Sequence, residues 1–162
     1  MIPGLALAMT ADYISELTAP LRDSANYPFG VDIPTRYADM DIYGHVNNVA
    51  LMSLFEDARV RFFKATGAQA LLGERRLLLV VAHTEYLGET RYPDPVHVRL
   101  GVLALGRSSW TVAQLALQRG VPCGYFRAKF VSAVEGGKAL PMLDAHRRCL
   151  AGQLLHHLRS EG

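Results

Sequence analysis

Apolar residues between positions 51 and 63 recur at spacings of three and four residues, which is the periodicity of a helix packed on much of its circumference. The residues of this pattern are Leu51, Met52, Leu54, Phe55, Ala58, Phe62 and Phe63. Asn47 or Asn48 is a candidate N-cap, because a short side-chain oxygen accepts a hydrogen bond from a free N–H of the first turn. Gly67 provides a stop signal. We therefore predict a long central helix between these two signals.

The pattern after the helix changes to runs that are rich in β-branched and aromatic residues, with partial alternation of apolar and polar positions. These runs cover residues 77–87, 96–105, 109–118 and 122–132. The segments between them are short and rich in turn-forming residues, which favours antiparallel neighbours. An earlier strand is expected over residues 30–37. This order of elements predicts an α+β fold, in which a curved antiparallel sheet wraps around the central helix.

The two ends of the chain have weaker patterns. Residues 10–22 are expected to form a short helix, with Thr10 as a cap and Pro20 near its end. Residues 144–158 carry leucines at helical spacing and basic residues toward their end. We therefore expect a single docking helix near the C-terminus.

Length and composition narrow the class of protein. The 162 residues are half hydrophobic and contain no repeat, which suits one compact domain with a core. We place that domain at residues 29–150, after an N-terminal extension over residues 1–28 and before a helical tail over residues 151–162. The net charge of +2, with acids and bases interspersed, gives no footprint for nucleic acid or for an anionic membrane.

The cysteines and the N-terminus bear on the compartment. Cys123 and Cys149 have no spacing typical of a zinc site or of a disulfide scaffold, so we expect packing residues in a reduced compartment. The N-terminus lacks the basic region of a secretory signal, and no apolar run is long enough to cross a bilayer. These features predict a cytoplasmic protein without a membrane partner.

A polar loop lies immediately before the central helix. Its chemically active residues are Asp39, Asp41, Tyr43, His45, Asn47 and Asn48. Gly44 permits a tight turn that a side chain would hinder. Exposed N–H groups and the positive end of the helix dipole stabilise an oxyanion that forms at such a helix start. The loop is therefore typical of a site for acyl transfer.

The stretch RYADMDIYGHVNNVALMSLFEDAR, over residues 36–59, resembles the loop and helix of hotdog-fold acyl-CoA thioesterases of the 4-hydroxybenzoyl-CoA thioesterase-like family. Its most specific part is D-x-D-x-x-G-H-V-N-N. The strands, turns and Gly-x-Ser-Ser segment that follow are also similar to this family, so the resemblance covers roughly residues 29–150. It implies a hotdog fold and an enzyme that hydrolyses acyl-CoA to a carboxylic acid and free CoA.

The resemblance also implies roles for individual residues. Asp41 occupies the position of the catalytic carboxylate, which either attacks the thioester carbonyl as a nucleophile or activates a water as a general base. A backbone N–H at Asn48 or its immediate neighbours would hold the thioester oxygen. His45 and Asn47 would support this machinery. The residues expected to contact the substrate are Tyr43 and Gly44.

The family further implies assembly. A sheet with an open edge can pair with a second copy, and hotdog proteins generally form homodimers, often doubled to homotetramers, with active sites between subunits. CoA would then contact both chains. The candidates for its phosphates are Arg91, Arg107, Arg127 and Lys129.

Asp39 and Asp41 have alternative interpretations. Either carboxylate could accept backbone hydrogen bonds within the loop, a role that we favour for Asp39 only. Together with His45 they could bind a divalent metal, but hard cations usually take more oxygen ligands. We expect no metal and no other cofactor.

The charged residues of the central helix also have two interpretations. Glu56 could be catalytic, but a salt bridge to Arg59 or to a neighbouring strand is the favoured interpretation. Asp57 and Arg61 are expected to form a surface pair four residues apart. At the level of the whole protein, the alternatives are a non-catalytic acyl-CoA-binding hotdog protein and a hotdog hydratase or dehydratase.

Overall fold

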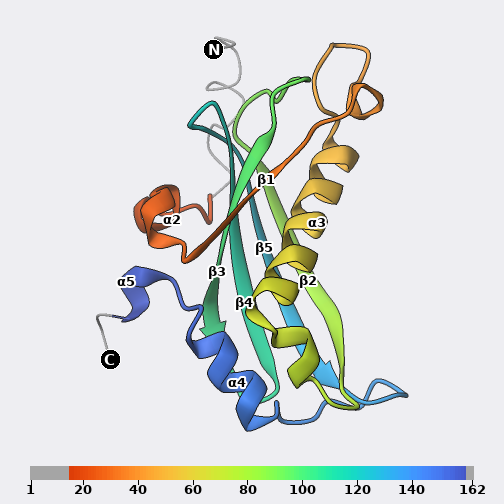
Figure 1. Cartoon of the computed structure of the whole chain (residues 1–162), viewed down its shortest axis with the longest axis vertical. Helices are drawn as coiled ribbons and strands as arrows, with labels where there is room; N and C mark the ends of the chain where they lie inside the picture. Colours follow the sequence, from red (N-terminus) through yellow and green to blue (C-terminus); the bar gives the residue numbers. More distant parts are fainter. Residues whose placement is uncertain (1–14, 160–162) are drawn as a thin grey trace.

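The computed structural model of the chain describes residues 15–159, in which five antiparallel strands form one curved sheet (Figure 1). The strands are β1 (Phe29–Ile33), β2 (Arg76–Tyr86), β3 (Val96–Leu105), β4 (Ser109–Gln118) and β5 (Val121–Ala133). Their order across the sheet is β1-β3-β4-β5-β2, so β3, β4 and β5 form a meander and β1 and β2 form the edges. The predicted sheet is confirmed, except that the first strand ends at Ile33, where Pro34 follows without an N–H to donate.

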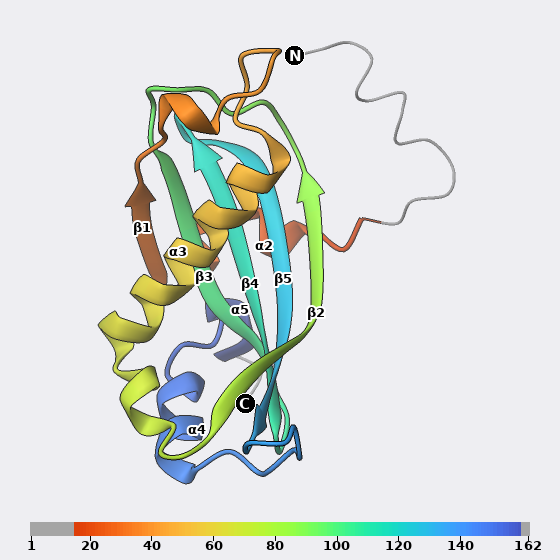
Figure 2. The same cartoon turned by 90° about the vertical axis from the view of Figure 1, so that its right-hand side faces the viewer.

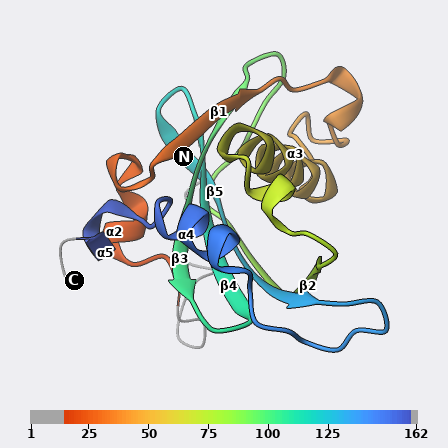
Figure 3. The ribbon, with the colours of Figure 1, turned by 60° about the horizontal axis from the view of Figure 1, so that its bottom comes forward.

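Helix α3 (Asn48–Thr66) lies within the curve of the sheet, as seen along the helix in Figure 3. The side chain of Asn47 caps the helix by accepting a hydrogen bond from the N–H of Ala50, and Gly67 ends it with a φ of 74°. The predicted central helix and its two end signals are confirmed. Its buried residues are Leu51, Leu54, Phe55, Ala58, Arg59 and Phe62.

Helix α3 crosses the concave face of the sheet obliquely (Figure 2). Near its start, the hydroxyl of Thr84 on β2 donates to the sulfur of Met52 (3.0 Å). Near its end, the ring of Phe62 packs edge-on against Phe29 of β1, with ring centroids 5.5 Å apart. The helix therefore leaves the first half of β2 uncovered, where Val80 is 51% exposed.

A second apolar cluster lies on the other face of the sheet. Because Phe126 stacks on a ring of α3, its strand neighbour Tyr125 points to the opposite face. There the N-terminal segment, which includes α2 (Ala19–Arg22) and the short helix η1 (Ser24–Asn26), packs against β4 and β5. The buried members of this cluster are Leu17, Leu21, Tyr27, Ala113, Leu115, Leu117, Tyr125 and Leu155.

The helix predicted over residues 10–22 is wrong in extent. Within the described residues α2 is one turn long, and Pro20 lies in its first turn, the position that tolerates a missing N–H, instead of near its end. The predicted cap Thr10 lies outside the described residues.

The C-terminal segment corrects another prediction. Instead of one helix it forms α4 (Asp144–Ala151) and α5 (His156–Arg159). Between them the chain pairs with β3, because the N–H of Val102 donates to the carbonyl of Gln153 (2.7 Å) and the N–H of Leu155 donates to the carbonyl of Val102 (3.0 Å). These backbone groups are available because β1 pairs with β3 only as far as Leu100. The free edge of β3 thus interrupts the helix.

Candidate active site

Two loops meet at the end of the sheet where α3 begins. The first includes the short helix η2 (Tyr37–Asp39) and leads into α3, and the second joins β2 to β3. The N–H of Val46 in the first loop donates to the carbonyl of Thr90 in the second (2.7 Å). The polar residues of the first loop are therefore held against the rest of the sheet.

Residues 39–47 form a short hairpin that ends at the start of α3. The N–H of Asn47 donates to the carbonyl of Asp39 (2.9 Å), and the N–H of Asp41 donates to the carbonyl of His45 (2.8 Å). Gly44 makes the turn with a φ of 76°, a conformation that residues with a side chain rarely adopt. The hairpin carries Asp41 back alongside the residues that open the helix.

The Asp41 carboxylate is held by backbone donors. Its Oδ1 accepts hydrogen bonds from the N–H groups of Tyr43 (2.8 Å) and His45 (3.1 Å). These bonds, that of His45 above all, lower the pKa of Asp41 below its usual value. Asp41 is therefore ionised at neutral pH. Within residues 15–159 no hydrogen bond engages its Oδ2.

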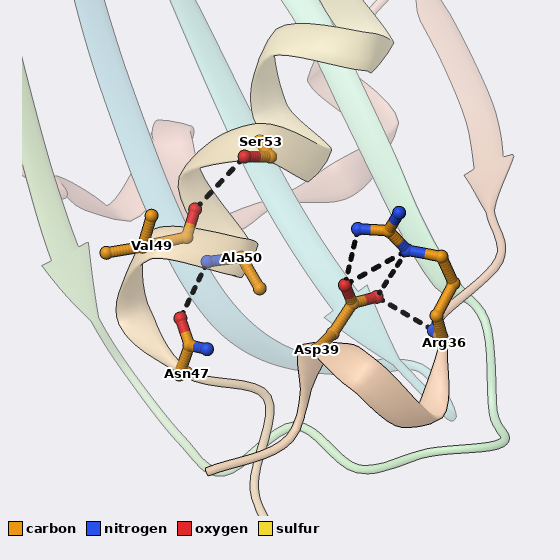
Figure 4. A network of polar contacts seen from close by, with 6 residues as sticks. All are labelled: Arg36, Asp39, Asn47, Val49, Ala50 and Ser53. Atoms are coloured by element: carbon orange, nitrogen blue, oxygen red, sulfur yellow. Dashed lines mark hydrogen bonds and ion pairs between the residues drawn. The ribbon is translucent and has the colours of Figure 1, made fainter.

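The first turn of α3 presents unused donors. The side chain of Asn47 takes the N–H of Ala50 (2.8 Å), as Figure 4 shows. In the described part of the chain, the N–H groups of Asn48 and Val49 have no acceptor. Because the first N–H groups of a helix have no partner within it, they suit a developing negative charge.

Asp39 is engaged within its own turn. Its carboxylate accepts hydrogen bonds from the backbone N–H of Arg36 (2.8 Å) and from the guanidinium of the same residue (2.7 Å and 3.1 Å), as drawn in Figure 4. The guanidinium holds the pKa of the Asp39 carboxyl below its usual value. Its side chain is 3% exposed, so Asp39 braces the base of the hairpin and leaves little surface for a substrate.

The imidazole of His45 points to the second loop. Its Nε2 lies 3.0 Å from Glu89 Oε2 and 2.7 Å from Arg91 Nη2, and Arg91 also donates to Glu89 (2.9 Å). Because one ring nitrogen faces both an acceptor and a donor, the protonation of His45 decides which contact is a hydrogen bond. Glu89 was absent from the predicted site, although the antiparallel topology places the end of β2 beside the start of the helix.

Some of the residues predicted to bind the substrate or its phosphates lie at the candidate site, and others lie away from it. Tyr43 is 75% exposed at the tip of the hairpin. Arg91 lies at the site, beside His45, whereas Arg127 forms a salt bridge with Glu16 of the N-terminal segment (2.8 Å). Arg107 belongs to the turn between β3 and β4, at the other end of the sheet.

Of the two salt bridges predicted for charged residues of α3, one is present and one is not. Asp57 and Arg61 form the expected pair (3.0 Å). The favoured salt bridge between Glu56 and Arg59 does not form within the described residues, because Arg59 turns inward and donates to Gln114 (3.0 Å) while Glu56 is exposed.

Metal ligands do not gather at the site. Within residues 15–159, no group of three or more His, Cys, Asp or Glu side chains could hold a metal ion. No helix in the same range is long and apolar enough to span a membrane. Both cysteines carry free thiols, and burial raises the pKa of Cys123 above its usual value.

Comparison with known proteins gives a consistent result. A sequence model of the thioesterase-like superfamily matches residues 35–147. The protein YsmA of Bacillus subtilis strain 168 is 24% identical over 127 residues, which are 77% of this chain and 86% of YsmA.

Solved structures of similar proteins match about three quarters or more of this chain. A thioesterase from Thermus thermophilus, complexed with coenzyme A and Zn, is 28% identical with a TM-score of 0.69, and the match covers 79% of this chain and 95% of that one. The PA5185 protein of Pseudomonas aeruginosa is 27% identical with a TM-score of 0.72, over 80% of this chain and 94% of that one. Slr0204 of Synechocystis, a 1,4-dihydroxy-2-naphthoyl-CoA thioesterase, is 15% identical with a TM-score of 0.69, over 76% of this chain and 95% of its own, and shares the fold.

Proposed function

The chain belongs to the thioesterase-like superfamily, and on this basis we propose that it hydrolyses acyl-CoA thioesters to a carboxylic acid and free CoA. The observation that supports the proposal best is the ionised Asp41 carboxylate, held on the hairpin that leads directly into the first turn of α3, where the N–H groups of Asn48 and Val49 are unpaired among the described residues. Carboxylate and donors stand at one end of the sheet, as acyl transfer requires. The coenzyme A in the similar Thermus thermophilus thioesterase supports CoA as the carrier.

Asp41 would provide the attacking group by one of two routes. In the first, its carboxylate adds to the thioester carbonyl, the CoA thiolate leaves, and water then hydrolyses the mixed anhydride. In the second, Asp41 takes a proton from a water that adds to the same carbonyl, and the CoA thiolate leaves with a proton. Its unengaged Oδ2 would serve in either route, since Oδ1 is occupied by backbone donors.

The start of α3 would stabilise the charge that forms on the thioester oxygen. Addition to the carbonyl turns that oxygen into an oxyanion, which the N–H groups of Asn48 and Val49 can bind. Donors that are already oriented lose no reorganisation energy during the reaction, so they favour the transition state over the substrate. Asn47 serves as the helix cap and keeps these donors in place.

A second copy of the chain would complete the site. The edge strand β2 exposes apolar side chains along its first half, namely Leu78 (39%), Leu79 (49%), Val80 (51%) and Val81 (47%). Its outer edge also leaves backbone donors and acceptors unpaired, which a second β2 could use in an antiparallel pair. Such a homodimer would join two sheets and place the acyl group between subunits.

The test is release of free thiol from a panel of acyl-CoA thioesters by wild type and by Asp41→Asn. The amide oxygen of asparagine can still accept the two backbone hydrogen bonds, so the hairpin should keep its shape while kcat falls by about 10²–10⁴-fold. Asp57→Asn, at an exposed carboxylate of α3, is the matched control. Turnover by Asp41→Asn at the wild-type rate would exclude Asp41 from the catalytic mechanism. A wild-type protein that binds acyl-CoA and releases no thiol would be a non-catalytic binding protein.

A further inference from the structure

One cation lies between α3 and the sheet. Arg59 is 9% exposed, and its guanidinium carbon stands 4.7 Å from the centre of the Phe126 ring. The Nη1 of Arg59 donates to the Oε1 of Gln114 (3.0 Å). Gln114 is fully buried, and its Nε2 donates to the carbonyl of Phe55 (2.9 Å). The guanidinium is thus fixed in one place by neutral groups.

The guanidinium of Arg59 makes no salt bridge among residues 15–159, although the negative charge of Glu56 acts on it from a longer distance and partly offsets the lowering of its pKa by burial. Among residues 15–159, no carboxylate lies within salt-bridge distance of it, and Glu56 on the same helix is exposed. A guanidinium has five N–H donors and stays protonated in proteins, yet a single donor bond to a side chain is made in the described part of the chain. Because burying a charge without a direct salt-bridge partner is costly, this arrangement favours the binding of an anion.

The position of Arg59 fits the far end of an acyl group. Gln114 links the guanidinium to the Phe55 carbonyl, which lies seven residues after Asn48. At 1.5 Å per residue, the guanidinium is roughly 10 Å along the helix axis from the donors of the first turn. Met52 lies between these two levels and contacts Thr84 of β2. Thr84 in turn pairs with Phe126, the residue beneath the guanidinium.

We propose that Arg59 binds a carboxylate at the far end of the acyl group, so that the preferred substrates are CoA thioesters of dicarboxylic acids. The inference rests on the proposed thioesterase function. With the thioester carbonyl at the first turn of α3, the methylene chain passes the side of the helix that carries Met52, and its terminal carboxylate meets the unused donors of Arg59.

The test compares octanedioyl-CoA with octanoyl-CoA, which differ in the terminal carboxylate. The quantity measured is the ratio of their kcat/KM values in wild type, Arg59→Met and Arg59→Gln. We expect the ratio to fall by at least about tenfold in both variants, the factor that corresponds to one charge-assisted hydrogen bond. Hydrolysis of octanoyl-CoA should persist in both, which shows that the variants are folded. Arg59→Gln keeps a polar group beside Gln114 and covers the case in which the methionine variant does not fold.

Arg61→Met is the matched control, because Arg61 lies on the same helix but is exposed and paired with Asp57. Its ratio should equal that of wild type. An equal ratio in wild type and in both Arg59 variants would overturn the inference and leave the thioesterase function standing. Absence of hydrolysis of every thioester by wild type would overturn the proposed function, and the inference with it.

Discussion

The backbone N–H of Asn48 can be removed without disturbing the helix that carries it. Asn48 is the first residue of α3, where proline is well accepted because the missing N–H has no intrahelical acceptor. The preceding residue, Asn47, has a ψ of 160°, which is the extended conformation favoured before proline. The side chain of Asn48 is exposed. Asn48→Pro therefore deletes one donor at the helix start and little else.

The magnitude follows from the role proposed for that donor. Loss of one oxyanion donor typically lowers kcat by about 10²–10³-fold. Because the new proline also restricts the unfolded chain, the melting temperature should stay equal or rise. Steady-state thiol release gives kcat, and a thermal melt gives the stability. Asn48→Ala, which keeps the N–H and removes the side chain, should retain near-normal kcat. A proline variant with wild-type kcat would refute the assignment of the oxyanion donor to Asn48.

Two further predictions concern assembly and pH. If two copies pair through β2, sedimentation equilibrium should give twice the monomer mass of 17.8 kDa. Val81→Lys at the centre of the strand should give monomers, because like charges would meet across the two-fold axis. Val121→Lys, at another exposed position, is the control, and a monomeric wild type would refute the pairing. His146 is 1% exposed, neither of its ring nitrogens has a partner among the described residues, and burial lowers its pKa below 6.5. As the pH falls, His146 therefore binds a proton in the unfolded chain before it does so in the folded protein. The free energy of unfolding, measured in urea, should then fall by up to about 1.4 kcal/mol per pH unit below pH 6.5. In His146→Leu this decrease in the free energy of unfolding below pH 6.5 should be absent. An unchanged pH dependence in the variant would contradict the assignment to His146.

The central helix and the meander were predictable because each leaves a local trace in the sequence. The cap at Asn47, the left-handed stop at Gly67 and the apolar spacing between them act within a few residues of one another. The strands over residues 96–105 and 109–118 were placed at their observed bounds for the same reason, since alternation and turn residues are local signals.

The misplaced features depend on contacts between distant residues. The C-terminal leucines have helical spacing, yet the free edge of β3 at Val102 captures Gln153 and ends the helix. Glu56 was predicted to form a salt bridge with Arg59 or with a neighbouring strand, but Arg59 turns inward and donates to Gln114 of β4. Glu89 reaches His45 only because the sheet brings two loops together. No local pattern contains these partners.

The segment before β1 changes what counts as the minimal folded unit. Leu17, Leu21 and Tyr27 are 4%, 6% and 0% exposed, and they cover Leu115 and Tyr125 on the back of the sheet. The span that matches the superfamily begins only at residue 35, so a fragment cut to that span would present these strand residues to water. The apolar side chains on the back of β4 and β5 are thus shielded from water only while the segment before β1 is present. Any truncation or fusion at this end has to begin before Leu17.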